Sequence, residues 1–132
     1  SEDTVYDLGS GDGRIPIMAA QKFGAKGVGV ELNAGLYKQA AARVKDLGLE
    51  DRVQMVHGDM LKVDLAPATI VTLYLLSSAN ARLRPIMEKD LQQGARVVTH
   101  DFEVPGWQPE KVQAIDDETQ PTIAHKLYLY RR

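Results

Sequence analysis

The strongest constraint on the fold is an apolar segment that leads directly into three glycines at alternate positions. Thr4–Leu8 has the composition of a buried strand, and Gly9, Gly11 and Gly13 follow it. Glycine adopts positive φ without strain and lets a ligand approach the backbone closely. A helical pattern from Arg14 to Phe23 comes next, and the first N–H groups of a helix are unpaired and carry a partial positive charge. The sequence therefore predicts a cofactor-binding loop between the first strand and the first helix.

The rest of the chain alternates strand-like and helix-like segments, which is typical of an α/β fold with a mostly parallel sheet. Further strands are expected at Gly27–Glu31, Val53–His57, Ile70–Leu75 and Arg96–His100. The segments Val112–Ile115 and Ile123–Tyr130 alternate apolar and polar residues, which predicts a closing antiparallel hairpin. With 132 residues and no internal repeat, we expect a single domain over residues 1–132.

Two more helices are expected between these strands. Asn33 is a good N-cap for the first, which we expect to end at Gly48. Its expected buried stripe is Leu36, Ala40, Val44 and Leu47. The second helical stretch, Ser78–Gln93, contains Pro85. Because proline has no N–H to donate, we expect Pro85 to divide the stretch into two short helices, the second ended by Gly94.

The residues around the glycine loop indicate which cofactor it binds. A dinucleotide fingerprint has a glycine at its sixth position, where this chain has the bulky cation Arg14. Asp7 lies two residues before the first glycine. Its carboxylate would repel a pyrophosphate but suits a ligand with an ammonium group, such as the methionine part of S-adenosylmethionine. The loop therefore favours S-adenosylmethionine over a nicotinamide dinucleotide.

Two further acidic residues are expected to contact the nucleoside. Glu31 ends the second strand about 20 residues after the loop, where a carboxylate accepts hydrogen bonds from ribose hydroxyls. Asp59 follows the third strand, where a short acceptor reaches the adenine amino group, and Met60 is placed to pack on the ring. A Gly-Asp pair is also common in plain turns, but Asp59 is expected at the same sheet edge as Asp7 and Glu31.

With these residues in place, the chain resembles the class I, Rossmann-like S-adenosylmethionine-dependent methyltransferases. The resemblance is closest to the lysine methyltransferases of the ATP synthase c-subunit and adenine nucleotide translocase type, with their small prokaryotic relatives. The segments that carry it are Val5–Ile15, Val28–Asn33, Val71–Leu76, Asn80–Pro85 and Gly94–Trp107. The resemblance implies a doubly wound seven-stranded sheet, mostly parallel with one antiparallel strand, in the order 3-2-1-4-5-7-6.

The resemblance also implies site residues and a substrate. It places Thr72, Leu73 and Tyr74 at the site of methyl transfer, so that Tyr74 and Thr72 are the expected catalytic residues. The expected cofactor-binding residues are Asp7, Gly9, Ser10, Gly11, Gly13, Glu31, Leu32, Asp59, Met60 and Thr72. The acceptor it implies is a lysine side chain of a protein substrate, methylated by an N-methyltransferase. Ser77 and Ser78 depart from the family, which commonly has proline there.

Composition and the remaining polar residues narrow the function further. A net charge of −2 argues against a nucleic-acid partner, because phosphate binding usually needs a basic surface. The chain has no cysteine, which excludes a thiolate nucleophile and fits a cytoplasmic location. No apolar run approaches the length of a membrane span. His57 and His125 have no partner at metal-ligand spacing, so no metal is expected. His100 and Asp101 follow the fifth strand, where polar residues are more often structural caps.

Three other functions remain open. In the first, the chain is a methyltransferase that acts on a small-molecule acceptor. The second is a binding-only domain, since relatives carry a segment before the first strand whereas here that strand begins at Thr4. The third is a nicotinamide dehydrogenase, which Asp7 and Arg14 oppose.

Overall fold

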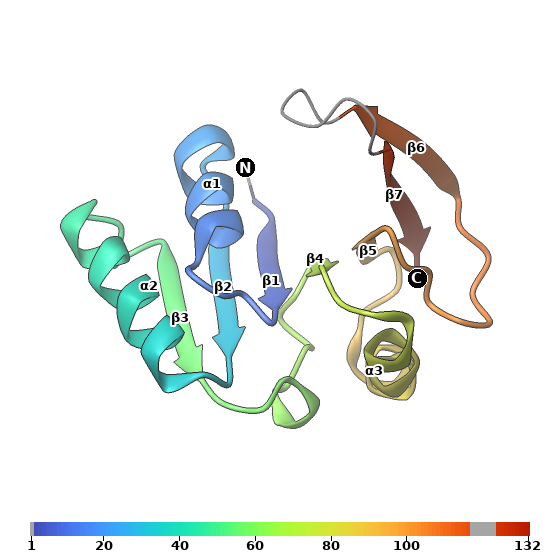
Figure 1. Ribbon diagram of the computed structural model, residues 1–132, viewed down its shortest axis with the longest axis horizontal. Helices are drawn as coiled ribbons and strands as arrows, with labels where there is room; N and C mark the ends of the chain where they lie inside the picture. The colour runs from blue at the N-terminus through green and yellow to red at the C-terminus, as the bar shows by residue number, and fades with distance from the viewer. Residues whose placement is uncertain (1, 117–123) are drawn as a thin grey trace.

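A computed structural model describes residues 2–116 and 124–132 of the chain. Within these residues, seven strands form one sheet in the order β3-β2-β1-β4-β5-β7-β6 (Figure 1). The strands are β1 (Thr4–Leu8), β2 (Lys26–Glu31), β3 (Val53–His57), β4 (Ile70–Leu73), β5 (Arg96–His100), β6 (Lys111–Asp116) and β7 (Ala124–Arg131). β1 to β5 are parallel, and β7 runs antiparallel to both β5 and β6. The predicted Rossmann-like sheet and its strand order are therefore confirmed.

Among the described residues, three α-helices and one short 3-10 helix connect the strands. They are α1 (Arg14–Phe23), α2 (Ala34–Asp46), η1 (Met60–Lys62) and α3 (Ser77–Asp90). Asn33 caps α2 as predicted, because its side-chain oxygen accepts the Leu36 N–H at 3.0 Å. Gly24 ends α1 with a left-handed φ of 66°. None of the helices in residues 2–116 and 124–132 is long and apolar enough to cross a membrane.

Side chains alternate between the two faces of the sheet, so that two layers of core form. On one face, Tyr6 and Leu8 of β1 join a large buried cluster that includes Leu83 and Met87 of α3. On the other face, Val5 packs with Ala19 of α1 and with Ala25, which follows that helix. Figure 1 shows α1 and α2 over the half of the sheet formed by β1, β2 and β3. The glycine loop lies at the edge of this covered half.

The α1 face of the sheet stays more open beyond β1. The strand register puts Asp7 beside Thr72 of β4, and Thr72 beside Val98 of β5. Thr72 and Val98 are half-buried, whereas Val71 and Val97, which point to the opposite face, are fully buried. The part of the chain that the structure describes has no helix over this half of the α1 face. The cofactor loop therefore borders an accessible stretch of sheet.

The expected bounds of α3 and of β4 were wrong. α3 is one helix that contains Pro85 and ends at Asp90, not two helices ending at Gly94. Leu83 and Met87, on either side of Pro85, are completely buried, and this packing outweighs the lost backbone hydrogen bond. β4 ends at Leu73, so Tyr74 and Leu75 lie in the following loop.

The buried stripe of α2 is narrower than predicted. Ala40 and Val44 are buried, but Leu36 and Leu47 are 38% and 45% exposed. α2 packs chiefly on the outermost strand, β3, so that only the centre of its apolar face meets the sheet. The predicted hairpin is present as the antiparallel β6–β7 pair; Ile123, expected to begin its second strand, lies outside the described residues.

Candidate active site

The glycine loop is anchored to the neighbouring strand by its own backbone. The N–H groups of Gly9 and Ser10 both donate to the carbonyl of Val30, at 2.9 and 3.0 Å. Gly9 and Gly13 have φ of 76° and 82°, and a Cβ at Gly13 would lie 3.1 Å from the Cβ of Ala40. Both the backbone conformation and the close approach of α2 therefore require glycine at position 13.

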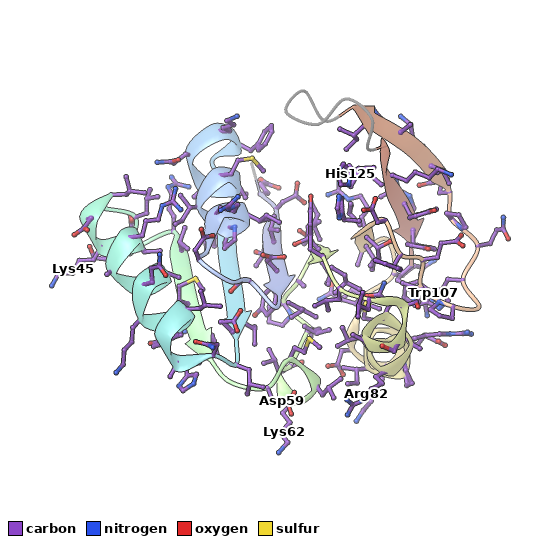
Figure 2. The ribbon with its side chains drawn as sticks, viewed as in Figure 1. Lys45, Asp59, Lys62, Arg82, Trp107 and His125 are labelled. Atoms are coloured by element: carbon purple, nitrogen blue, oxygen red, sulfur yellow. The ribbon has the colours of Figure 1, made fainter. Side chains whose placement is uncertain are left out.

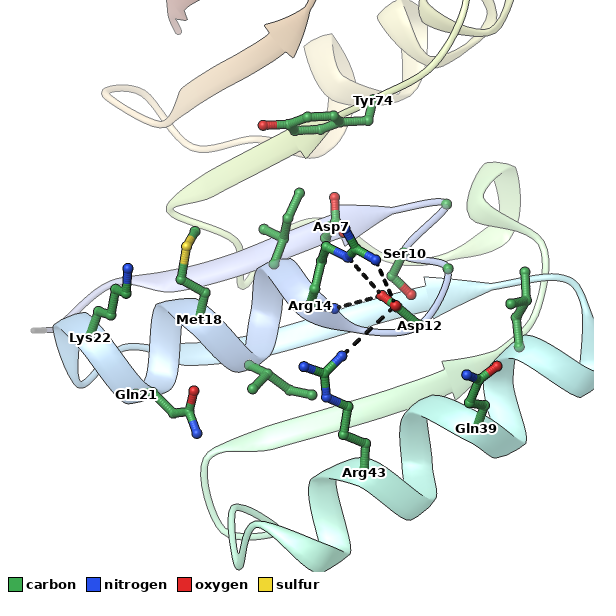
Figure 3. A pocket seen from close by; sticks show the side chains of 15 residues that line it. Asp7, Ser10, Asp12, Arg14, Met18, Gln21, Lys22, Gln39, Arg43 and Tyr74 are labelled. Atoms are coloured by element: carbon green, nitrogen blue, oxygen red, sulfur yellow. Dashed lines mark hydrogen bonds and ion pairs between the residues drawn. The ribbon is translucent and has the colours of Figure 1, made fainter. Parts of the chain in front are cut away.

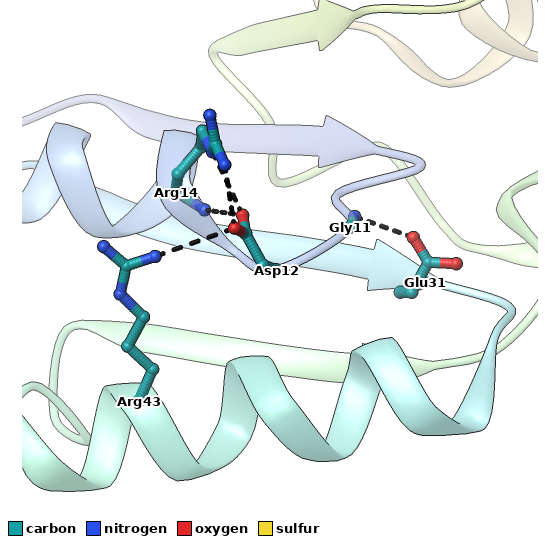
Figure 4. A network of polar contacts seen from close by, with 5 residues as sticks. All are labelled: Gly11, Asp12, Arg14, Glu31 and Arg43. Carbon is teal, nitrogen blue, oxygen red and sulfur yellow. Dashed lines mark hydrogen bonds and ion pairs between the residues drawn. The ribbon is translucent and has the colours of Figure 1, made fainter.

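Glu31, at the end of β2, holds the loop from its other side (Figure 4). Its Oε1 accepts the Gly11 N–H at 2.7 Å, and its Oε2 accepts the Asn33 N–H at 2.9 Å. Each carboxylate oxygen has two lone pairs, so both keep capacity for a ligand. Glu31 thus has a structural role that the sequence did not reveal.

Asp12, just before α1, contacts two arginine side chains (Figure 4). The Arg14 guanidinium donates to it at 3.0 and 3.2 Å, and Arg43 of α2 lies 3.8 Å away. The hydrogen bonds from Arg14, together with both positive charges, lower the pKa of Asp12. Arg14 therefore does more than disfavour a dinucleotide: it is part of a charged rim beside the loop.

Asp7 is a buried carboxylate at the base of the site. It is 3% exposed, and the Thr72 hydroxyl donates to its Oδ1 at 2.7 Å. Burial raises the pKa of Asp7 to about 7, although the Thr72 hydrogen bond lowers it; the charge of Glu31 raises it slightly further. An ammonium group placed here would stabilise the ionised form. Ser10 adds a buried hydroxyl with no hydrogen-bond partner among the described residues.

Two adjoining cavities are lined by eight of the ten predicted cofactor residues, all except Gly13 and Thr72. The larger, about 890 Å³, is lined by Asp7, Ser10, Gly11 and Tyr74 together with α1 and α2 (Figure 3). The smaller, about 160 Å³, is lined by Glu31, Leu32, Asp59 and Met60, and the two share Gly9. Thr72 lines neither, but its hydroxyl reaches Asp7. Their combined size suits a nucleoside-containing ligand.

Asp59 lies at the nucleoside end of the site. It caps η1, and its Oδ1 accepts the Leu61 N–H at 2.9 Å. Figure 2 shows Asp59 beyond the carboxyl ends of β2 and β3, the strand ends at which open α/β sheets bind ligands. Met60 packs against the large core cluster, so only part of its side chain faces the cavity.

Tyr74 lies over Asp7 at the mouth of the larger cavity (Figure 3). Its ring is half-exposed and stacks on His100 with centroids 4.6 Å apart and planes 11° apart. Partial burial raises the pKa of Tyr74, and the charges of Asp7 and Asp101 raise it further. Both carboxylates therefore lie close enough to the Tyr74 hydroxyl to disfavour its ionisation.

The sequence did not reveal that His100, Asp101 and His125 lie together. His125 Nδ1 is 3.0 Å from Asp101 Oδ2, and His100 Nε2 is 3.8 Å from the same oxygen. The expectation that His125 has no partner at ligand spacing was therefore wrong: the donor atoms of the three residues lie within 4.8 Å of one another. The pairing of β5 with β7 brings these side chains together. The alternation of side chains along these two strands, which the sequence predicted to pair, was the signal that could have indicated this contact.

The Asn80–Pro85 segment holds the loop that follows β5. The buried Asn80 side-chain amide donates to the carbonyls of Phe102 and Glu103, at 3.0 and 3.2 Å. Arg84 donates to the carbonyl of Pro105 at 2.9 Å. These contacts fix the chain next to Asp101, which has a left-handed φ of 63°. The segment is thus a support for the site and not part of its lining.

Comparison with known proteins identifies the family. The sequence model of the ANTKMT methyltransferase domain matches residues 7–111. The chain is 44% identical over 130 residues to a protein-lysine N-methyltransferase of Saccharolobus islandicus, covering 98% of this chain and 79% of that one. It is 35% identical over 106 residues to the ATP synthase c-subunit lysine N-methyltransferase of Mus musculus, covering 80% of this chain but only 42% of that one.

A solved structure is also similar over nearly the whole chain. It is an RNA methyltransferase from Salinibacter ruber in complex with S-adenosyl-L-homocysteine, 43% identical with a TM-score of 0.87, covering 98% of this chain and 80% of that one. The glycine loop, the buried Asp7 and this complex agree on the methyl donor, S-adenosylmethionine. The chain belongs to the ANTKMT methyltransferase family.

Proposed function

We propose that this chain transfers methyl groups from S-adenosylmethionine to the side-chain amine of lysine in a protein. The observation that carries the proposal is the position of Tyr74, at the mouth of the larger cavity and beside an open stretch of sheet. A long flexible amine can enter there from outside, while the cofactor is held below. The named activities of the Saccharolobus and mouse relatives support the same acceptor.

The cofactor would be held along the glycine loop. In this proposal Asp7 faces the methionine ammonium, and the backbone of Gly9, Ser10, Gly11 and Gly13 surrounds the remainder of the methionine part. Ionised Asp7 then has two partners, the ligand and the Thr72 hydroxyl. Thr72 therefore positions the Asp7 carboxylate for the methionine ammonium.

The nucleoside would occupy the smaller cavity. Glu31 keeps free lone pairs on both oxygens after accepting the Gly11 and Asn33 N–H groups, so it can accept hydrogen bonds from the ribose. Asp59 and Met60 would contact the adenine, with Leu32 covering it from the solvent side.

When bound, the cofactor supplies a methyl group on a sulfonium, which a neutral amine attacks in line. A lysine amine has a pKa of about 10.4 in water and arrives protonated at neutral pH. The Tyr74 ring forms one wall of the entrance and keeps the amine aligned. Most of the acceleration then comes from alignment and from exclusion of water.

A second acceptor class has one observation in its favour. The Salinibacter structure, 43% identical to this chain, is named as an RNA methyltransferase. Arg14, Lys22 and Arg43 line the larger cavity, but the whole chain has a net charge of −2. Extended phosphate binding normally needs a more basic surface, so we favour protein over RNA.

Labelling separates these acceptors. The purified chain is incubated with S-adenosylmethionine carrying a tritiated methyl group and a bacterial lysate, and the product is treated with protease or with ribonuclease. We expect acid-precipitable label that protease removes and ribonuclease leaves. Label removed by ribonuclease would establish RNA as the acceptor. Label in the small-molecule fraction would establish a metabolite as the acceptor. Cofactor binding without any transfer would establish a binding-only domain.

We also infer that residues 1–132 act as one domain in the cytoplasm. One continuous sheet includes strands from both ends of the chain, and the absence of cysteine fits a reducing compartment. Limited proteolysis that leaves one resistant fragment tests the first inference, and cell fractionation tests the second.

A further inference from the structure

Three rings and a carboxylate form a continuous group beside the cofactor cavity. Tyr74 stacks on His100, and His100 stacks on His125 with centroids 4.9 Å apart. The Asp101 carboxylate lies along the edge of both imidazoles. The side chains of His100, Asp101 and His125 are 26%, 32% and 27% exposed, so the group is accessible without being fully solvated.

The strand register directs this group to the same face as the cofactor carboxylate. Thr72 pairs with both Asp7 and Val98. His100 follows Val98 by two residues and therefore points to the same face. His100 pairs with Leu127 of β7, and His125 precedes Leu127 by two residues. Tyr74 joins the cavity that contains Asp7 to this group.

The geometry of the rings favours proton transfer over binding of a metal ion. Two imidazoles that share an ion direct their in-plane lone pairs to one point about 2.1 Å from each nitrogen. Here the ring planes are 25° apart and stacked, so the planes run alongside each other. A carboxylate beside stacked imidazoles instead stabilises the positive charge that appears when one ring gains a proton.

We propose that His100 is the base that takes the proton from the incoming lysine ammonium, and that Asp101 and His125 position and stabilise the His100 ring. This rests on the proposed lysine methyltransferase function. The His100 tautomer with Nε2–H beside Asp101 leaves the Nδ1 lone pair to accept the proton.

The proton balance of the step is simple. The lysine ammonium loses one N–H proton to His100 Nδ1. The resulting amine lone pair forms the N–C bond as the C–S bond breaks, and the electrons of that bond go to sulfur. The products are a methylated ammonium, S-adenosylhomocysteine and a protonated His100, which returns its proton to water.

The charged and titratable groups that face His100 are consistent with this role. Tyr74 follows β4, Asp101 follows β5, His125 lies on β7, and Asp7 lies beyond Tyr74 on β1. Asp101 accepts the Lys126 N–H at 2.9 Å, and this hydrogen bond is the main cause that lowers the pKa of its carboxyl. Asp101 therefore stays ionised throughout the neutral range and compensates a proton on His100.

The pH dependence of single-turnover methylation tests the proposal. At pH 7 a base that accepts the proton is worth roughly 100-fold in rate, so His100→Gln should lose about that much with S-adenosylhomocysteine affinity unchanged. The loss should shrink to a few-fold at about pH 10, where solvent already deprotonates the lysine. The readout is protein-bound label from a fixed amount of lysate, measured at each pH for parent and variant.

His57→Gln is the matched control. His57 stacks on Tyr37 and contacts the Leu32 carbonyl at the nucleoside end, so its pH profile should keep the parental shape. Asp101→Asn should show the same pH-dependent loss as His100→Gln in weaker form. An equal rate for His100→Gln and parent at pH 7, or a loss that stays constant up to pH 10, would overturn the proposal. Activity abolished by a chelator and restored by a divalent cation would also overturn it.

A second measurement needs no turnover and keeps the proposal testable if a variant does not fold. The ring proton signals of the three histidines are followed by NMR in the S-adenosylhomocysteine complex while n-butylamine is added. We expect the His100 signal to move and that of His57 to stay. An unmoved His100 signal would contradict the proposal. A parent that labels no lysine would refute the proposed function instead, and the two failures are thereby distinguished.

Discussion

At the scale of single residues, the site depends on carboxylates that are held in different environments. Asp7 is buried next to a hydroxyl, whereas Glu31 is bonded to two backbone N–H groups. The sequence indicated both residues by their distance from the glycine loop. It did not indicate their environments, because these depend on the Thr72 hydroxyl from β4 and on the turn after β2.

Asp7→Asn should make the protein without its cofactor more stable and bind the cofactor less well. The native pKa of about 7 lies above the value of 3.8 for an unperturbed carboxyl. The native state thus holds more protons between these values, and stability falls as the pH rises from about 4 to about 7. The difference corresponds to at most about 4 kcal/mol.

Urea unfolding of this variant and the parent at pH 5 and pH 8 measures the effect. The variant should gain stability relative to the parent at pH 8 but little at pH 5, and calorimetry should show about 10- to 100-fold weaker S-adenosylhomocysteine binding. Equal stability of the two proteins at pH 8 would mean that Asp7 is not held in a desolvated environment.

Glu31→Ala should weaken cofactor binding and also loosen the loop. Loss of charge-assisted hydrogen bonds to the ribose should cost about 1.5–3 kcal/mol of binding free energy. The Gly11 and Asn33 N–H groups also lose their acceptor, so unfolding free energy should fall by about 1–2 kcal/mol. Glu31→Gln, which keeps one carbonyl oxygen, should be intermediate in both calorimetry and urea unfolding. Unchanged affinity in the alanine variant would restrict Glu31 to its structural role.

Tyr74 substitutions should separate the ring from the hydroxyl. Tyr74→Phe keeps the stack on His100 and should retain turnover within about threefold, whereas Tyr74→Ala removes the wall and should cost about tenfold or more. Cofactor affinity should change little in both, because Tyr74 borders only the mouth of the cavity. Full methylation of lysate protein by Tyr74→Ala would place the entrance elsewhere.

At the scale of elements, local rules predicted strands better than helix interiors. Glycine and alternating apolar residues delimit β1, β3 and β5, and these bounds were confirmed. Pro85 was misjudged, because a local rule about proline omits the burial of Leu83 and Met87 around it. The contact of His100 with His125 was missed as well. It joins β5 and β7, which are neighbours in the sheet although β6 lies between them in the sequence.

Asn80 should be the residue through which α3 stabilises the loop after β5. Asn80→Ala removes two hydrogen bonds and leaves the carbonyls of Phe102 and Glu103 without this donor. Unfolding free energy should fall by about 2–4 kcal/mol. Ser78→Ala, exposed on the same helix, is the control and should change it by less than about 0.5 kcal/mol in urea unfolding. Equal effects of the two substitutions would contradict the tethering role.

At the scale of the whole molecule, folding and cofactor binding should be linked. The two cavities are formed by β1, β2, α1, α2 and the chain after β3 and β4, so only the folded chain can bind. S-adenosylhomocysteine at 100 times its Kd should therefore raise unfolding free energy by about 2.7 kcal/mol. NAD at the same concentration should give no change in urea unfolding; stabilisation by NAD would contradict the assignment of the glycine loop.

The identity of the methylated amino acid separates lysine methylation from the other proposed reactions. Protein labelled by the purified chain and tritiated S-adenosylmethionine is hydrolysed to amino acids and separated by chromatography. We predict that the label migrates with methylated lysine and that reactions without the purified chain contain none. Label that migrates with another amino acid, or with a nucleoside from copurified RNA, would contradict lysine methylation by this chain.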